Sequence, residues 1–268
     1  MRIKFASWNV NNRLLQESHL ELLSKVNSDI LAFQEVNPKF YNALSNTNLF
    51  TFSVFSPLLR RHHKTYRKAR RLGCALFGKT PFTIVSSFLL DDVPFPERAL
   101  VVRLKSPECF ITACSFHTPP GASWGELKPE SHKILAMWLS SQKNRFILGI
   151  DANAPKTDHP DITKNEWWWK EEILLLGAKP LHNLKDTLRV YLDSHPDILQ
   201  SIKQSRPNGP LTVSYIRGNR SRIWCRYDLI YATPDIRVNN VEYLYEESVK
   251  AGSNHAMVVS ELEVTDVG

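Results

Sequence analysis

Polar residues of the types that handle phosphate esters stand at or near the ends of apolar segments in this sequence. They occur in Trp8-Asn9-Val10-Asn11, Gln34-Glu35, His117, Asp151-Ala152-Asn153, Asp228 and Asn254-His255. If the apolar segments are strands, these amides, carboxylates and imidazoles can converge on one rim of a sheet. Hydrolysis of a phosphodiester needs a metal ion, an oriented water, a base, and donors for the transition state. The six motifs contain a candidate for each of these parts.

The segments that must position these residues alternate between apolar runs and helical stretches. The runs have the length and composition of strands, and lie at Ile3–Val10, Ile30–Gln34, Cys74–Phe77, Leu100–Leu104, Phe110–Phe116, Phe146–Ile150, Tyr227–Ala232 and Met257–Leu262. Helices are predicted at Ser18–Val26, Glu130–Ser141 and Glu166–Leu176. Mixed strands and helices in this order predict layered sheets flanked by helices.

The composition of the chain excludes several classes of protein. A hydrophobic fraction of 43% over 268 residues is typical of a folded globular protein, not a disordered one. No apolar run approaches the roughly 20 residues that cross a bilayer, and no signal peptide is evident, so a cytosolic location is predicted. Four scattered cysteines are predicted to be buried free thiols. Without repeats or linkers, a single domain over residues 1–268 is expected, and a monomer.

Taken together and in order, the motifs resemble those of the endonuclease/exonuclease/phosphatase superfamily. The matching segments are Ser7-Trp8-Asn9-Val10-Asn11, Asp29-Ile30-Leu31-Ala32-Phe33-Gln34-Glu35-Val36, Phe116-His117-Thr118-Pro119, Leu148-Gly149-Ile150-Asp151-Ala152-Asn153, Arg226-Tyr227-Asp228-Leu229-Ile230 and Gly252-Ser253-Asn254-His255. The fourth segment departs from the family's Gly-Asp-x-Asn pattern by the insertion of Ile150. Each motif alone is weakly specific, but six in family order, spread over nearly the whole chain, form a strong signal.

The resemblance implies an α/β (α+β) fold, a four-layer sandwich of two mixed β-sheets flanked by helices, as in the deoxyribonuclease I-like and exonuclease III-like proteins. It also implies a divalent-metal-dependent phosphoric ester hydrolase. Glu35, assisted by Asn9, would hold the metal, and Asn254 occupies a further position of the family's metal site. A hard cation with few protein ligands fits Mg²⁺, and Mn²⁺ is able to substitute.

The family mechanism implies a role for each remaining site residue. Asp151 would orient or deprotonate the attacking water, and Asn153 would help to position the phosphate and the nucleophile. His255 would donate a hydrogen bond to the phosphate, while Asp228 would hold its ring and favour its charged form. His117 would contact another phosphate oxygen or assist the leaving group.

Asn254 departs from the family pattern, because most relatives carry Asp at this point of the motif. An amide has no negative charge, so its field on a cation is weaker. Reduced metal affinity, or one metal where some relatives hold two, is therefore expected. A catalytically weakened protein that only binds nucleic acid remains an alternative, although the carboxylates and the histidine of the other motifs are all present.

The positive charge of the chain, +7 in total, is concentrated in acid-free stretches. One stretch contains the cations Arg60, Arg61, Lys64, Arg67, Lys68, Arg70 and Arg71. Another, Ile198–Tyr227, interleaves cations with aromatic residues, among them Arg222, Trp224 and Arg226. Clustered cations neutralise phosphates, and cations with aromatic rings suit single strands or exposed bases. These stretches predict a nucleic-acid partner, with DNA favoured over RNA, and a nuclease as the function.

Three consecutive tryptophans, Trp167, Trp168 and Trp169, follow the Asp151 motif. Three consecutive positions of a helix cannot share one face, so at least one ring is predicted to be exposed, where it could stack on a base. His117 stands where abasic-site endonucleases usually carry Tyr, which favours a more general nuclease. A phosphatase or a lipid or inositol-phosphate phosphodiesterase of the same fold is the other alternative, with basic loops facing anionic headgroups.

Overall fold

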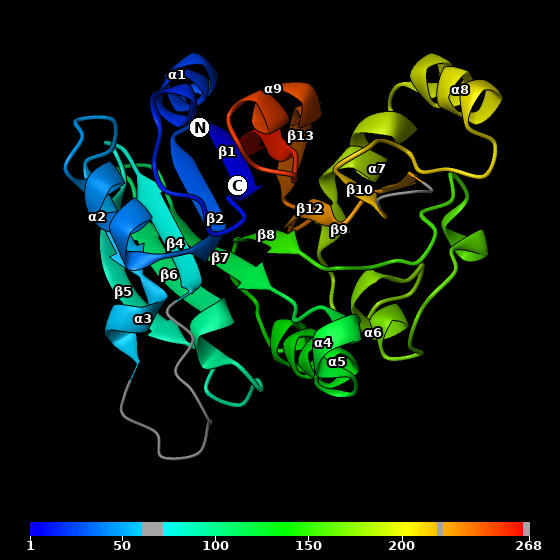
Figure 1. The fold of residues 1–268 in the computed structure, drawn as a ribbon, viewed down its shortest axis with the longest axis horizontal. Coiled ribbons are helices and arrows are strands. Elements are labelled where there is room, and N and C mark those ends of the chain that lie inside the picture. The colour runs from blue at the N-terminus through cyan, green and yellow to red at the C-terminus, as the bar shows by residue number, and fades with distance from the viewer. Residues whose placement is uncertain (61–71, 219–221, 265–268) are drawn as a thin grey trace.

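The strands of the computed structural model, which describes residues 1–60, 72–218 and 222–264, form two six-stranded sheets and a hairpin (Figure 1). The first sheet has the order β13 (Ile236–Leu244), β14 (Met257–Val264), β1 (Arg2–Asn9), β2 (Ile30–Val36), β4 (Gly73–Gly78) and β3 (Phe52–Phe55). The second has the order β5 (Thr83–Leu89), β6 (Ala99–Lys105), β7 (Phe110–His117), β8 (Phe146–Asp151), β12 (Asp228–Ala232) and β9 (Lys185–Asp186). The hairpin joins β10 (Tyr215–Arg217) and β11 (Ile223–Cys225).

Each six-stranded sheet has one parallel pair of strands at its centre. These pairs are β1 with β2 and β7 with β8, and the other pairings of the two sheets are antiparallel. The carboxyl ends of parallel neighbours lie at the same edge of a sheet. Since β2 also packs against β7, the two central pairs bring their carboxyl ends to one region of the molecule.

The helices cover the outer faces of the two sheets. On the first sheet, α1 (Glu17–Val26) and α2 (Pro38–Ser45) bury apolar residues such as Leu23 and Phe40 in one cluster with Phe33. On the second, α5 (Leu127–Ser140) and α6 (Glu172–Leu176) bury Leu135 and Leu175 in the same way. A third apolar core fills the space between the sheets. The predicted four-layer sandwich is therefore confirmed.

Short helices complete the described part of the chain. They are α3 (Ser56–Leu59), the 3-10 turn Pro96–Arg98, α4 (Gly121–Trp124), the 3-10 turn Ile162–Lys164, α7 (Thr187–Asp193), α8 (Pro196–Ser205) and α9 (Tyr245–Lys250). Among the described residues, no helix is both long and apolar enough to span a bilayer. All four cysteines are buried and free, as predicted.

The predicted strands each overlap an observed strand. The predicted helix Glu166–Leu176 is correct only in its second half. Helix α6 begins only at Glu172, and the three tryptophans before it are not helical. The backbone N–H of Trp168 donates to the Glu172 carboxylate at 3.0 Å, and Glu166 pairs with Thr157 in an isolated β-bridge. These hydrogen bonds replace those that a helix over 166–171 would need.

Candidate active site

The strand ends bring together side chains from five of the six sequence motifs and place the sixth beside them. Asn9 ends β1, Glu35 lies near the end of β2, His117 ends β7 and Asp151 ends β8. Asp228 begins the antiparallel strand β12, so it faces Asp151 directly in the strand register, as does His117 from the other side. His255 reaches the same place from the loop that precedes β14. The sequence prediction of a convergent polar rim is confirmed.

Strand β2 is irregular at Glu35, and this irregularity separates two neighbouring side chains. The register of β2 against β4 shifts between Phe33 and Val36, and Glu35 adopts a left-handed φ of 54°. Such a conformation is uncommon for a glutamate, and strained residues of this kind cluster at functional sites. As a result Gln34 stays fully buried, whereas the Glu35 carboxylate comes within 3.4 Å of His117 Nε2.

Asp151 is the centre of the cluster, and its carboxylate is almost fully buried. Its Oδ2 accepts a hydrogen bond from Asn9 Nδ2 at 2.7 Å, and its Oδ1 accepts one from the Asn153 backbone N–H at 3.0 Å. His117 Nε2 lies 3.6 Å from Oδ2. Burial raises the pKa of Asp151 to about 6, against the lowering effect of the His255 cation. A carboxylate with this pKa is suited to accept a proton near neutral pH.

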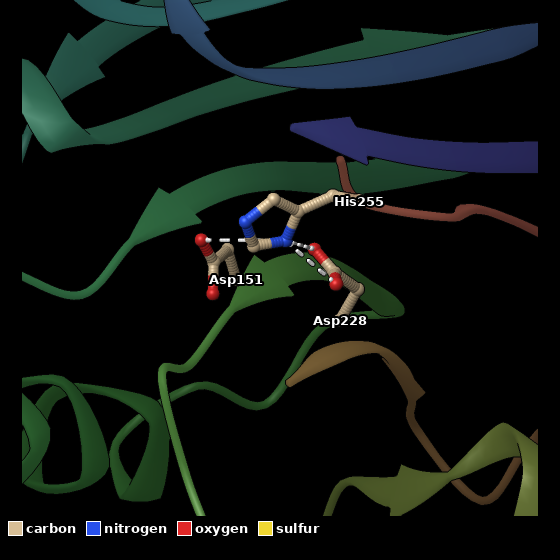
Figure 2. Close-up of side chains that lie close together, drawn as sticks. All are labelled: Asp151, Asp228 and His255. Carbon is tan, nitrogen blue, oxygen red and sulfur yellow. Dashed lines mark hydrogen bonds and ion pairs between the residues drawn. The ribbon is translucent and has the colours of Figure 1, made fainter. Parts of the chain in front are cut away.

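His255 is held by a carboxylate at one ring nitrogen only. Its Nδ1 contacts the Asp228 oxygens at 2.9 and 3.1 Å and lies 3.9 Å from Asp151, as Figure 2 shows. Burial lowers the pKa of His255, but the charge of Asp228 and then that of Asp151 raise it to about 9. The Tyr215 ring stacks on the imidazole with centroids 4.7 Å apart. The ring is therefore charged at neutral pH, and Nε2 is the nitrogen that can donate to a ligand.

Asn153 is held from two sides, and one of its supports was missed by the sequence analysis. Its Nδ2 donates to the Thr118 carbonyl at 2.9 Å, and its own carbonyl accepts from Lys128 Nζ at 2.8 Å. Lys128 also forms an ion pair with Glu172 at 2.5 Å, and both side chains are almost completely buried. A lysine on an amphipathic helix is normally solvated, and no spacing in the sequence pointed to this pair.

The oxygen donors at the rim fit a divalent cation. Burial, and next the charge of Asp151, raises the pKa of Glu35. The two carboxylates therefore repel one another electrostatically. A bound cation would relieve that repulsion, and carboxylate and amide oxygens are ligands that Mg²⁺ accepts. Asn9 Oδ1 accepts from the Asn11 backbone N–H at 2.8 Å, which fixes the orientation of the amide. Asn254 is exposed.

Asp151, Asp228 and His255 offer a second set of metal-ligating atoms, all within 4.8 Å of one another. However, Nδ1 of His255 is already within hydrogen-bond distance of Asp228. A metal would have to displace this charge-assisted bond, so these three residues fit an acid–base cluster better than a metal centre. The fit to a metal therefore rests on Glu35 with Asn9.

Of the residues predicted to bind nucleic acid, Arg61, Lys64, Arg67, Lys68, Arg70 and Arg71 lie outside the described residues. Arg60 ends α3 and is half-buried. Arg222 and Trp224, beside and within β11, are exposed, and they line a shallow hollow together with Lys156.

Arg226 was also predicted to contact nucleic acid, and this prediction is wrong. Its side chain is 2% exposed, and its guanidinium is ion-paired with Asp158 at 2.8 Å and with Asp186 at 2.6 Å. Both aspartates lie far from Arg226 in the sequence, so their contact with it was not visible there. The guanidinium is buried and cannot reach a substrate.

The tryptophan segment, defined as residues 167–169, is partly exposed, as predicted. Trp168 and Trp169 are 42% and 36% exposed, whereas Trp167 packs against the core beneath α6. The Arg217 guanidinium lies over the Trp168 ring, 4.9 Å from its centroid.

Comparison with known proteins identifies the class to which the fold and the rim of polar residues belong. The family model described as "Endonuclease/Exonuclease/phosphatase family" matches residues 6–255, and the chain belongs to this family. Its members are divalent-metal-dependent phosphoric ester hydrolases, which places this chain in that class of enzymes. No curated protein sequence matches the chain significantly.

Solved structures share the fold over nearly the whole chain. They include D. rerio TDP2 complexed with single-strand DNA product, with a TM-score of 0.67, 10% identity, and 98% of this chain and 99% of that chain covered. An endonuclease/exonuclease/phosphatase protein from Bacteroides vulgatus has a TM-score of 0.65 and 15% identity, with 99% of this chain and 100% of that chain covered. The human Nocturnin catalytic domain with bound sulfate anion has a TM-score of 0.63 and 20% identity, with 98% of this chain and 95% of that chain covered. At these identities the likeness shows the fold.

Proposed function

We propose that this protein is a nuclease that hydrolyses phosphodiester bonds by in-line attack of an activated water, with DNA favoured over RNA. The observation that carries the proposal is the contrast within the cluster: His255 is held charged by Asp228, while Asp151, almost fully buried, has a pKa raised toward neutrality. A charged donor and a proton acceptor side by side are the two groups that attack of water on a phosphate ester requires.

The metal site would be formed by Glu35 with Asn9, and by Asn254 from the neighbouring loop. Mg²⁺ bound there, or Mn²⁺ in its place, would neutralise charge on the phosphate. The amide of Asn254 contributes no charge to the site, so we expect modest metal affinity.

The protein's own groups then divide the work of the reaction. Asp151 orients the attacking water and accepts its proton, and its two oxygens are kept in place by Asn9 and the Asn153 backbone. His255 donates through Nε2 to a phosphate oxygen, and Asp228 keeps the ring charged and oriented. His117, which lies between Glu35 and Asp151, contacts another phosphate oxygen or assists the leaving group.

Nucleic acid is proposed as the substrate because cations and exposed rings lie on and near the β10–β11 hairpin, which contacts the cluster through Tyr215. Trp224 of β11 and the adjacent Arg222 are exposed, and the guanidinium of Arg217, in β10, lies over the Trp168 ring. Cations contact the sugar–phosphate backbone, and aromatic rings stack on bases. The cytosolic location, the monomeric state and the single domain remain predictions.

Cleavage assays on three substrates test the proposal. Wild type and His255→Ala would be compared on supercoiled plasmid, single-stranded DNA and RNA, with Mg²⁺, Mn²⁺ or EDTA. We expect metal-dependent cleavage that falls about 10²- to 10⁴-fold in His255→Ala. His195→Ala is the matched control, because that histidine stacks on Tyr191 next to α8, outside the cluster.

Two outcomes would replace the proposal. Cleavage of none of the three nucleic acids, with release of phosphate from inositol phosphates or of headgroups from vesicles, would favour the phosphatase or lipid phosphodiesterase alternative. Tight, salt-sensitive binding of nucleic acid without cleavage of any substrate would favour the weakened binding protein suggested by Asn254.

A further inference from the structure

Four aromatic side chains line a cavity of about 500 Å³ that lies next to the catalytic cluster. They are Trp168 and Trp169 of the tryptophan segment, and Tyr215 and Tyr227 from the ends of the β10–β11 hairpin region. The volume lies in the range of roughly 300–1,000 Å³ that small-molecule sites occupy. Aromatic walls are suited to a planar, largely apolar group that is held by stacking.

Two residues belong to the cavity and to the cluster at once. Asn153 lines the cavity, and its backbone N–H donates to Asp151 at 3.0 Å. Tyr215 lines the cavity, and its ring stacks on His255 with centroids 4.7 Å apart. A group that fills the cavity therefore lies next to the place where the phosphate would bind. The occupant and the reacting phosphate would belong to the same or adjacent parts of one substrate.

The charges around the cavity favour an anionic substrate. Arg217 and Lys128 both contribute to the lining, and none of the described lining residues is acidic. Lys128 is already paired with Glu172, but Arg217 lies over the Trp168 ring. A guanidinium is itself planar, so it can stack on a base, and it can contact a phosphate at its edge.

We infer that this cavity binds the nucleoside attached to the scissile phosphate, and that this nucleoside must be unpaired. The inference rests on the nuclease function proposed above and specifies its substrate as a single strand or an unpaired end. A base inside a duplex is stacked and paired, and its faces are not available to the cavity walls. The enzyme would therefore select for single-stranded nucleic acid through the tryptophan segment and the hairpin.

The test compares substrates that differ only in their bases or pairing. Wild-type enzyme with Mg²⁺ would be given a short oligothymidylate, the same strand paired with oligoadenylate, and an oligomer of base-free deoxyribose phosphates of equal length. We expect the single strand to be cleaved at least about tenfold faster than the duplex. The base-free oligomer should have a KM raised roughly 5- to 150-fold, the range expected for losing one stacked base.

Variants assign the effect to the cavity. Trp168→Ala should raise the KM for oligothymidylate roughly 5- to 150-fold and change the KM for the base-free oligomer clearly less, while Trp168→Phe should restore most of the loss. Ile173→Ala, which removes an exposed apolar side chain from α6 outside the cavity lining, is the matched control and should behave as wild type.

A binding measurement without metal separates this inference from the proposed function. Anisotropy of labelled oligothymidylate and base-free oligomer would be recorded in EDTA with wild type and Trp168→Ala. Stronger binding of oligothymidylate, lost in Trp168→Ala, supports the cavity even if no substrate is cleaved. Equal binding and equal kcat/KM for the two oligomers would overturn the inference, and the nuclease function would stand if both were cleaved.

Discussion

Asp151 and Asp158 are buried on the same stretch of chain, but their electrostatic surroundings are opposite. Asp158 contacts the guanidiniums of Arg226 at 2.8 Å and Arg189 at 2.6 Å. Although burial raises the pKa of Asp158, these two cations lower it below its usual value. Asp151 meets amide donors and one imidazolium, and burial raises its pKa to about 6.

The difference teaches how to separate a structural ion cluster from a reactive one in this protein. A buried carboxylate that is fully compensated by cations is part of the framework, and removing a partner leaves an unpaired charge. A buried carboxylate that is under-compensated keeps an affinity for a proton, a cation or a polarised water, which is what a catalytic site uses. The two aspartates therefore predict different consequences when each is changed.

The largest effect should follow from removing the reactive carboxylate. Asp151→Asn should lower kcat/KM on single-stranded DNA about 10²- to 10⁴-fold, because the proposed proton acceptor is lost while the side-chain shape is kept. Its free energy of unfolding should fall less than that of a variant that breaks a buried ion pair, since the change removes a poorly compensated buried charge but leaves one of two donors without an acceptor. Activity assays with Mg²⁺ and urea unfolding at pH 7 measure the two quantities. Retention of activity in Asp151→Asn would assign the proton acceptor elsewhere.

The reverse pattern is expected in the compensated cluster. Arg226→Met should lower the free energy of unfolding by about 3–5 kcal/mol, because Asp158 and Asp186 lose their shared buried partner. Urea unfolding followed by circular dichroism measures the loss. Arg222→Met is the matched control, because Arg222 is exposed, and its stability should stay within about 0.5 kcal/mol of wild type. A wild-type unfolding midpoint for Arg226→Met would contradict the structural role.

Added Mg²⁺ should stabilise the protein through the proposed metal site near Asp151, with a smaller change in unfolding free energy than that expected for Arg226→Met. Mg²⁺ at about 100 times its Kd should raise the free energy of unfolding of wild type by about 3 kcal/mol. Glu35→Gln should show a clearly smaller gain, because the carboxylate at the proposed metal position is gone. Thermal unfolding over a Mg²⁺ titration measures both. If Glu35→Gln gained as much as wild type, the metal would have to bind elsewhere.

Two buried histidines differ in the same way as the two aspartates. His255 is held charged by Asp228, whereas His132 is buried as a neutral ring. Burial lowers its pKa to about 3, and its Nδ1 has no hydrogen-bond partner among the described residues. Protonation there would leave a buried N–H without an acceptor. The folded-state pKa lies below the unfolded value of 6.5, so the stability from this group is complete above pH 6.5 and is lost as pH falls toward 3.

This loss should amount to about 1.6 kcal/mol between pH 6.5 and pH 5 for one histidine. His132→Gln removes the titrating group, so the difference in unfolding free energy between wild type and this variant should change with pH by that amount. Urea unfolding at several pH values measures it. A difference that does not vary with pH would mean that His132 is not buried as a neutral ring.

Much of the fold could be predicted from the sequence because it depends on local patterns. Apolar runs of strand length indicated the central strands, and the polar residues that end them indicated the rim of the active site. Strands such as β5 and β13 were not predicted, because polar residues interrupt their apolar runs. The bulge at Glu35 could not be predicted either, because a register shift depends on the pairing of β2 with β4.

The errors and omissions in the site arose where a long-range contact decides a residue's surroundings. Arg226 lies in a basic, aromatic stretch that is typical of nucleic-acid contact, but two distant aspartates bury it. Lys128 and Glu172 each look like a surface residue of a helix, and only their pairing makes them internal. Local sequence gives the type of a charged side chain but not its partner, and the partner determines whether the charge is structural or available.

The pairing of β1 with β14 has a consequence for the timing of activity during synthesis. Arg2 faces Glu263 across these strands, so the first sheet cannot be completed until almost all of the described chain has left the ribosome. At about 5–20 residues per second, β1 would wait roughly 13–50 s for β14, whose Glu263 lies about 260 residues away. His255 precedes β14 and is delivered in the same final step. A nascent chain would therefore carry Glu35, the proposed metal ligand, long before it carried His255, the group proposed to contact the phosphate.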